Sequence, residues 1–158
     1  MKKQKGFSLI ELLIVVAIIL IIAAIAIPNL MRARMSANES SAAGSIRTIN
    51  TAEVSFDTTY PTLGFGALTA LGGAQPCTPS STTGCFIDNF LATNGAGAGK
   101  DGYGFTVTAP SLVGYSSNAD ALTINQTGTR SFCSDQTGVI YNLAGANGCT
   151  TATGTPLQ

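Results

Sequence analysis

Residues 7–27 read FSLIELLIVVAIILIIAAIAI, and Ser8 and Glu11 are the only polar side chains in these 21 residues. At a rise of 1.5 Å per residue, a helix of this length is about 31 Å long, which matches the hydrocarbon thickness of a bilayer. A segment in lipid must satisfy its backbone hydrogen bonds internally, and this requirement outweighs the modest helix cost of Ile and Val. The segment therefore predicts a membrane-spanning helix.

The charges of the chain are unevenly placed around this segment. Lys2, Lys3 and Lys5 precede it and supply three of the eight positive charges. A short basic cluster before an apolar run is typical of membrane targeting with the basic end in the cytoplasm. The formal net charge of the whole chain is zero. Because affinity for nucleic acid depends mainly on neutralised phosphates, we expect no nucleic-acid partner.

Glu11 is the residue that separates the possible kinds of membrane segment. A secretory signal peptide cleaved near Ala24-Ile25-Ala26 would fit the basic start and the apolar run, and so would a plain membrane anchor. Neither a signal peptide nor a plain anchor needs a carboxylate within the bilayer. Placing an ionised glutamate there costs on the order of 2–4 kcal/mol. Glu11 is therefore a candidate functional residue.

Residues 6–12, GFSLIEL, follow the lysines and begin an apolar run that ends at Pro28. This arrangement resembles the leader of type IV prepilins and pseudopilins. The resemblance implies that a dedicated prepilin peptidase cleaves between Gly6 and Phe7 and methylates the new N-terminal amine of Phe7. It covers the chain from the lysines to about Pro61 and becomes diffuse beyond that point.

The resemblance also implies a role for Glu11 in assembly. Cleavage would leave a positive amine on Phe7, four residues and about one helical turn before Glu11. A paired buried charge costs far less than an isolated one. In the family, the amine of an incoming subunit is expected to meet the glutamate of a neighbour and to set the axial register of the filament. The alternative is that Glu11 pairs only within its own chain.

Pro28 lies just past the apolar run, where pilins commonly have a helix proline. It cannot donate to the carbonyl four residues earlier, so it either kinks the helix or marks the helix end at the membrane surface. Beyond it, apolar residues recur with gaps of three, four and seven, which predicts an amphipathic continuation of the helix. These residues are Met31, Met35, Ala42, Ile46, Ile49 and Phe56. The pattern stops at Tyr60-Pro61, because a residue before proline is pushed out of helical geometry.

The rest of the chain predicts a small α+β pilin fold. We expect residues 61–101, rich in Gly, Ser and Thr, to form a predominantly irregular loop. Residues 102–158 show short alternating segments separated by turn residues, which predicts an antiparallel sheet of about four strands packed on the helix. The predicted parts are a leader (1–6), a membrane or filament-core helix (7–27), its amphipathic continuation (28–60), the loop (61–101) and the sheet (102–158). The sheet residues expected to be buried against the helix are Phe105, Val107, Phe132 and Ile140.

The four cysteines, Cys77, Cys85, Cys133 and Cys149, all lie in the C-terminal half. Their spacing is not that of a zinc site, and the chain has no histidine. An even number of cysteines beyond a membrane-targeting segment predicts disulfides formed outside the cytosol. Four cysteines allow three connectivities, among which pairing of sequence neighbours is the simplest.

No residue pattern indicates an enzyme, a metal site or a cofactor, and the chain would be the substrate of a peptidase rather than a peptidase itself. The expected function is that of a structural, major subunit of a type IV pilus for adhesion, motility or DNA uptake. The alternatives are a type II secretion pseudopilin and a minor pilin. The expected partners are other copies in a helical homopolymer, the prepilin peptidase and methyltransferase, an inner-membrane assembly platform, and lipid before assembly. The chain would pass from the inner membrane, as a single-pass precursor, to an extracellular filament.

Overall fold

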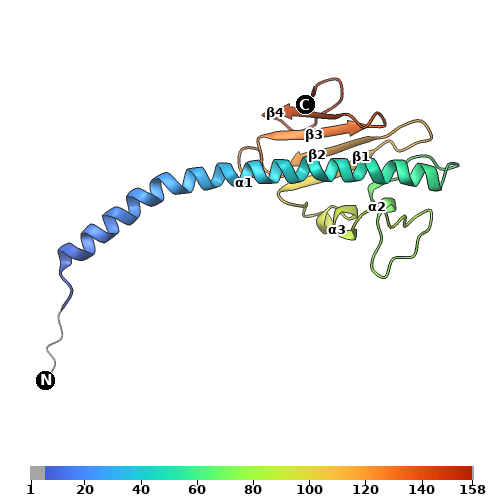
Figure 1. Cartoon of the computed structure of the whole chain (residues 1–158). Coiled ribbons are helices and arrows are strands. Elements are labelled where there is room, and N and C mark those ends of the chain that lie inside the picture. The colour runs from blue at the N-terminus through green and yellow to red at the C-terminus, as the bar shows by residue number, and fades with distance from the viewer. Residues whose placement is uncertain (1–5, 158) are drawn as a thin grey trace. The chain divides into compact units, whose positions relative to one another are not determined.

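The described residues contain one long helix, α1 (Leu9–Thr59), and an antiparallel sheet that follows it in the chain, so the predicted α+β fold is confirmed (Figure 1). This computed structural model describes residues 6–157, and the three lysines before Gly6 lie outside the described residues. The chain divides between Arg34 and Met35 into two units, and we call residues 35–157 the head unit.

The shorter helices are α2 (Leu68–Leu71), α3 (Asn89–Ala92) and the 3-10 turn η1 (Gly95–Gly97). The strands are β1 (Tyr103–Thr108), β2 (Ser116–Ala121), β3 (Arg130–Asp135), β4 (Ile140–Ala144) and β5 (Thr155–Pro156).

The part of α1 in the head unit packs on the sheet through the predicted apolar stripe. Its central residues Ile46 and Ile49 are fully buried, and Phe56 is 2% exposed. Met31 does not belong to this buried stripe, contrary to the periodicity, because its side chain is 51% exposed. The helix ends at Thr59, directly before Tyr60-Pro61, as the restriction on a residue preceding proline requires.

The sheet has the strand order β1-β2-β3-β4-β5, and every neighbouring pair is antiparallel. Four strands agree with the four predicted segments, and Phe105, Phe132 and Ile140 are buried as expected. Val107 is only half-buried. The fifth strand was not predicted, because two residues, one of them a proline, carry no alternation to recognise.

The connection between α1 and β1 is more ordered than its composition suggests. Leu71 in α2 is fully buried and Leu91 in α3 is 1% exposed, so the connection supplies part of the core. Asp88 caps α3 by accepting a hydrogen bond from the backbone N–H of Leu91 at 2.9 Å. Asn94 accepts a hydrogen bond from the backbone N–H of Phe105 at 2.7 Å. This bond joins the segment to the outer edge of β1.

Two disulfides join the sequence neighbours, Cys77 to Cys85 and Cys133 to Cys149. The first closes a loop in the connection between α2 and α3. The second holds the C-terminal loop against the face of the sheet that looks away from α1, where Asn118 donates a hydrogen bond to the carbonyl of Cys149 at 3.1 Å. The sheet is therefore covered by α1 on one face and partly by this loop on the other.

Candidate functional site

The Gly6–Phe7 peptide bond lies in an exposed, non-helical segment just before α1 begins at Leu9. The Phe7 side chain is 78% exposed. Proteases act on exposed backbone outside regular structure, which is where nicking concentrates in proteins. The bond can therefore be reached without unwinding any of α1.

Glu11 is held beside this bond by a hydrogen bond within its own chain. Its Oε2 atom accepts from the backbone N–H of Ser8 at 2.9 Å. Ser8 directly precedes α1 and Glu11 is the third residue of the helix, so the contact is one half of a capping box. The Ser-x-x-Glu spacing signalled this cap in the sequence, and our sequence analysis missed it. The cap places the carboxylate one residue away from the amine that cleavage would create.

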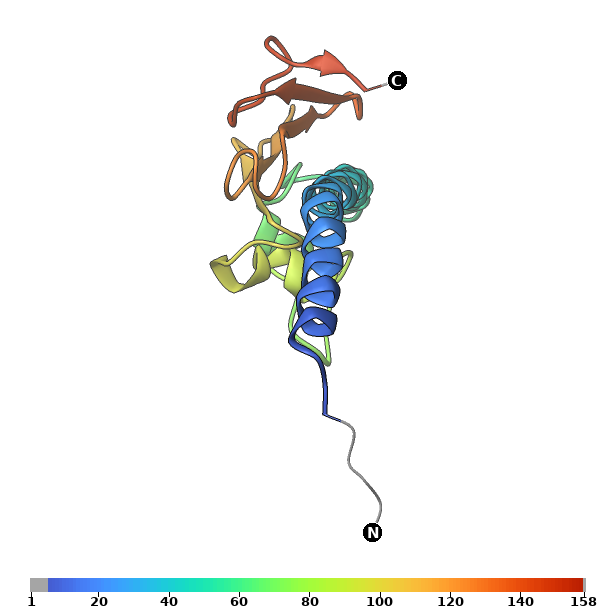
Figure 2. The same cartoon turned by 90° about the vertical axis from the view of Figure 1, so that its left-hand side faces the viewer.

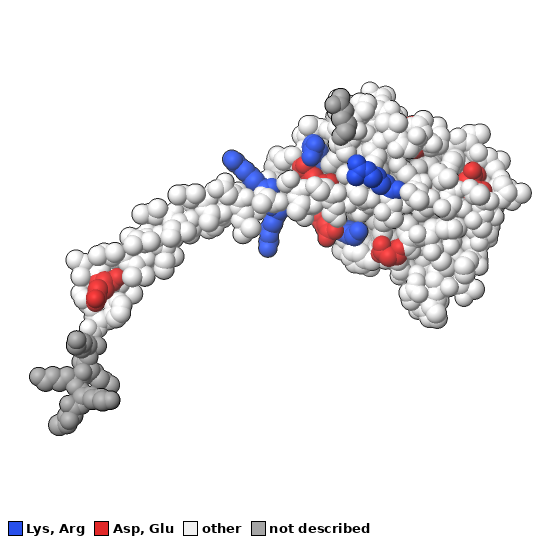
Figure 3. Space-filling model, in the orientation of Figure 1, with Lys and Arg blue, Asp and Glu red and all other residues white. Residues whose placement is uncertain are grey.

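The N-terminal part of α1 presents apolar side chains on all sides. Every residue from Gly6 to Arg34 except Ala23 is exposed in the single chain, and no charged residue lies between Glu11 and Arg32. Figure 3 shows this stretch of the helix as an uncharged surface. The described residues contain one helix long and apolar enough to cross a membrane, by length and composition, and it is α1. A helix that is apolar all round requires lipid or protein around it.

Pro28 lies inside α1, and the helix continues past it to Thr59. The alternative that the helix ends at the proline therefore does not describe this chain. Because Pro28 has no N–H, the carbonyl of Ala24 has no partner four residues ahead of it in the helix. Residues 6–34 thus combine an exposed peptide bond, a capped carboxylate and an apolar helix whose side chains are exposed in the single chain.

Residues 1–27 match the family described as the prokaryotic N-terminal methylation motif. The chain has a prepilin-type N-terminus. Over 39 residues it is 64% identical to the type IV wide pilus major component PilA4 of Thermus thermophilus, an alignment that covers 25% of this chain and 30% of that protein. Over 54 residues it is 48% identical to the type IV major pilin protein PilA of Myxococcus xanthus, covering 34% of this chain and 24% of that protein. The similarity thus spans less than a third of either relative.

In the head unit of this prepilin-like chain, Glu39 joins α1 to the sheet. Its Oε1 atom accepts hydrogen bonds from the N–H and the hydroxyl of Thr129, both at 2.7 Å. Its Oε2 atom pairs with Arg130 at 2.8 Å. Burial alone would raise the pKa of Glu39, but the bonds from Thr129 and Arg130 lower it below the ordinary value. Glu39 is therefore an ionised anchor for the helix on the sheet.

Asn50 provides a second polar contact between α1 and the sheet. Its amide donates to the hydroxyl of Ser134 at 2.8 Å, and its carbonyl oxygen accepts from the hydroxyl of Tyr115 at 2.9 Å. Burial, and then the nearby carboxylates Glu53 and Asp135, raise the pKa of Tyr115, so its hydroxyl remains protonated. These bonds fix the register of the helix against β3.

Glu53 is the one carboxylate of the head unit's described residues that is buried without a cation. Its side chain is 0% exposed, Oε2 accepts from the backbone N–H of Gly66 at 2.9 Å, and Oε1 has no hydrogen-bond partner. Burial raises the pKa of Glu53 to about 7, although the bond from Gly66 opposes the shift. Our sequence analysis missed Glu39, Asn50 and Glu53, yet all three lie at helical spacing within the apolar stripe.

The raised pKa of Glu53 predicts that the head unit loses stability as the pH rises. The folded state holds the proton more tightly than the unfolded state, so the full stability is present below about pH 4.5 and is lost as the pH rises through about 7. We expect the free energy of unfolding to fall by on the order of 2 kcal/mol between pH 5 and 8. Glu53→Gln should remove most of this slope. Urea unfolding of the full chain in detergent, followed by tyrosine fluorescence at each pH, measures it.

Glu39→Gln is the matched control, because it removes a carboxylate that already titrates below the ordinary range. This variant should be less stable than the wild type at each pH between 5 and 8 but keep the slope over this range. An equal slope in wild type and Glu53→Gln would show that Glu53 does not titrate in this range.

Proposed function

We propose that this chain is the major structural subunit of a type IV pilus. It is made as a single-pass precursor in the inner membrane, cleaved between Gly6 and Phe7, methylated on Phe7 and polymerised through α1 into an extracellular filament. Residues 1–6 are the leader, residues 7–27 enter first the membrane and then the filament core, and residues 28–60 carry the head. The named relatives, a wide-pilus major component and a major pilin, support the pilus over the pseudopilin alternative.

The observation that carries this proposal is the exposed apolar N-terminal helix with a single carboxylate near its start. Lipid can cover such a helix in the precursor, and the same helices of neighbouring copies can cover it in a filament. The carboxylate of Glu11 then gains a cation, the methylated amine of Phe7 in a neighbouring copy. The proposed partners are therefore other copies, the prepilin peptidase and methyltransferase, the assembly platform and lipid, with no catalytic role for the chain itself.

The test is to shear filaments from cells that express the chain and to sequence their main subunit by mass spectrometry. We expect abundant filaments built of this chain, with an N-terminal methylated Phe7. A strain lacking the gene is the control and should lose these filaments. If protein secretion is intact in that strain, the chain is a pilus subunit. A loss of secretion would instead indicate a pseudopilin. Recovery of a soluble chain trimmed after Ala26 would overturn the proposal, because the apolar helix would then be discarded.

A further inference from the structure

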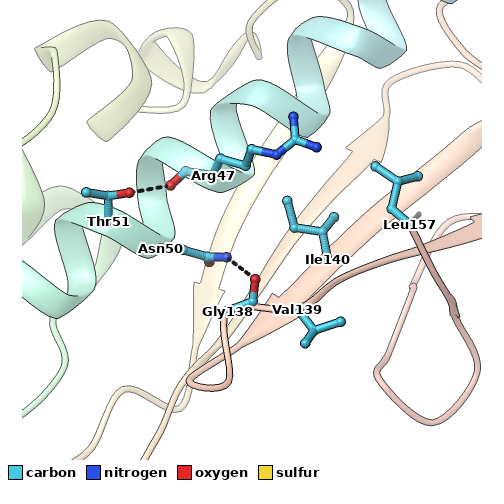
Figure 4. Close-up of a pocket in the computed structure, with 7 residues that line it drawn as sticks. All are labelled: Arg47, Asn50, Thr51, Gly138, Val139, Ile140 and Leu157. Atoms are coloured by element: carbon cyan, nitrogen blue, oxygen red, sulfur yellow. Dashed lines mark hydrogen bonds between the residues drawn. The ribbon is translucent and has the colours of Figure 1, made fainter.

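A hollow lies in the head unit between α1 and the β4 side of the sheet (Figure 4). We call it the seam groove, and its volume is about 540 Å³. The lining residues are Arg47, Asn50, Thr51, Gly138, Val139, Ile140 and Leu157. A second hollow of about 230 Å³ also has Arg47 and Leu157 in its lining, so the two adjoin at these side chains.

The seam groove combines an apolar wall with a cation that has no partner among residues 6–157. Ile140 and Leu157 project into it from β4 and from the C-terminal segment, as Figure 4 shows. Arg47 extends from α1 toward the same space, and within residues 6–157 its guanidinium has no hydrogen bond or ion pair. Arg130, by contrast, is paired with Glu39. The seam groove therefore suits a group that has an apolar body and a carboxylate.

The opposite edge of the same head unit carries such a group, which we call the edge knob: Asp88, Phe90 and Leu122. Phe90 is 54% exposed and Leu122 is 53% exposed. Both side chains lie against the glycine-rich turn, Phe90 beside Gly95 and Leu122 beside Gly99. Asp88 uses Oδ1 for the cap of α3, and among residues 6–157 no hydrogen bond uses Oδ2.

The edge knob and the seam groove lie on opposite flanks of the head unit. The knob adjoins β1, the first strand of the sheet, whereas the groove adjoins β4, next to the last strand. Figures 1 and 2 agree on this, since α3 and the red C-terminal strands lie on opposite sides of the unit in both views. A knob on one flank cannot enter the groove of its own chain, but it can enter that of another copy.

We propose that the edge knob of one copy docks into the seam groove of the next copy in the filament. Asp88 pairs with Arg47 of the neighbour, and the Phe90 ring covers Ile140 and Leu157. Because the two surfaces are different patches on opposite flanks, the contact is heterologous and can repeat from copy to copy without closing. This inference rests on the proposed function, since it names a head-to-head contact of the polymer that α1 begins.

The test measures how fast sheared filaments release subunits in mild detergent. Arg47→Gln and Asp88→Asn each remove one charge, and asparagine keeps the capping oxygen of α3. We expect about threefold faster release for each variant, and the double variant should be no faster than the worse single variant. Phe90→Ala should speed release by more than about tenfold. Asp57→Asn is the matched control, because no hydrogen bond within residues 6–157 uses the Asp57 side chain.

A cross-linking arm tests the contact itself. Filaments of the double variant Thr51→Cys and Asn89→Cys should form disulfide-linked copies under mild oxidation, and neither single variant should do so. Additive effects of Arg47→Gln and Asp88→Asn, with no cross-link between copies, would overturn the contact while leaving the pilus function intact. A cross-link to a different protein would also overturn it. If the wild-type chain forms no filaments, the proposed function is wrong. This inference, which rests on it, is then wrong as well.

Discussion

Glu11→Ala is expected to lower the yield of filaments at least about 100-fold while the precursor still inserts and is still cleaved after Gly6. Removing one partner of a desolvated charge pair costs roughly 2–5 kcal/mol, and about 2.7 kcal/mol corresponds to a factor of 100. In the proposed filament, the amine of Phe7 would lose its carboxylate in surroundings that exclude water. Immunoblots of sheared filaments and of membranes measure yield and cleavage in the same cells.

Glu11→Gln separates this role from the cap of the helix. A glutamine oxygen can still accept the hydrogen bond from Ser8, but it carries no charge. If the charge pair sets assembly, the glutamine variant should be nearly as defective as the alanine variant. Normal filaments from Glu11→Gln, with a loss only in Glu11→Ala, would assign Glu11 to capping alone.

Glu39→Ala is expected to destabilise the head unit by about 2–4 kcal/mol. It leaves the donors of Thr129 and Arg130 without their acceptor and breaks a largely buried ion pair. Breaking such a pair costs about 3–5 kcal/mol when both partners are buried, and the 40% exposure of the Arg130 side chain reduces the loss here. Urea unfolding of the full chain in detergent, at pH 7, measures the change.

Ser41→Ala is the matched control on the same helix, because it removes an exposed hydrogen bond from the Ser41 hydroxyl to Asp101. Its loss should stay below about 1 kcal/mol. The stability that Glu39 gives to the head unit should also decrease in acid. Its pKa is lowered in the folded state, so this stability is present above pH 4.5 and is lost as the pH falls. Equal losses for Glu39→Ala and Ser41→Ala would contradict the role of Glu39 as an anchor.

The sequence predicted the first half of the long helix from its apolar length, its second half from the spacing of apolar residues, and four strands from short segments bounded by turn residues. Ile46, Ile49 and Phe56 repeat at helical spacing and are buried. The strands lie in short segments separated by turn residues, and among them β2 shows the clearest alternation of burial. The sequence did not predict α2 and α3, because four-residue helices are too short to show a period. Their leucines are buried through contacts with distant parts of the chain, which no local pattern records.

The candidate site was predicted in part. The apolar run and Glu11 were evident from residue type, and the resemblance to prepilins implied the cleavage bond between Gly6 and Phe7, but the anchors of the head unit were not predicted. Glu39, Asn50 and Glu53 were passed over because only apolar residues were counted toward the buried face of the helix. Their partners, such as Thr129 and Gly66, lie far away in the sequence or in a turn. A polar residue at a buried helical position is the signal that would have identified all three.

The cap formed by Ser8 and Glu11 has a consequence for the chain end that the proposed cleavage would create. After the proposed cleavage, Phe7 would be the only residue ahead of a helix terminus that is already ordered by the hydrogen bond between Ser8 and Glu11. Little conformational freedom then remains for the amine to lose when it meets a second copy, since preorganised groups bind with a smaller entropic penalty. The closer a charged amine lies to an ordered helix terminus, the less entropy is lost when each added subunit positions it against its partner.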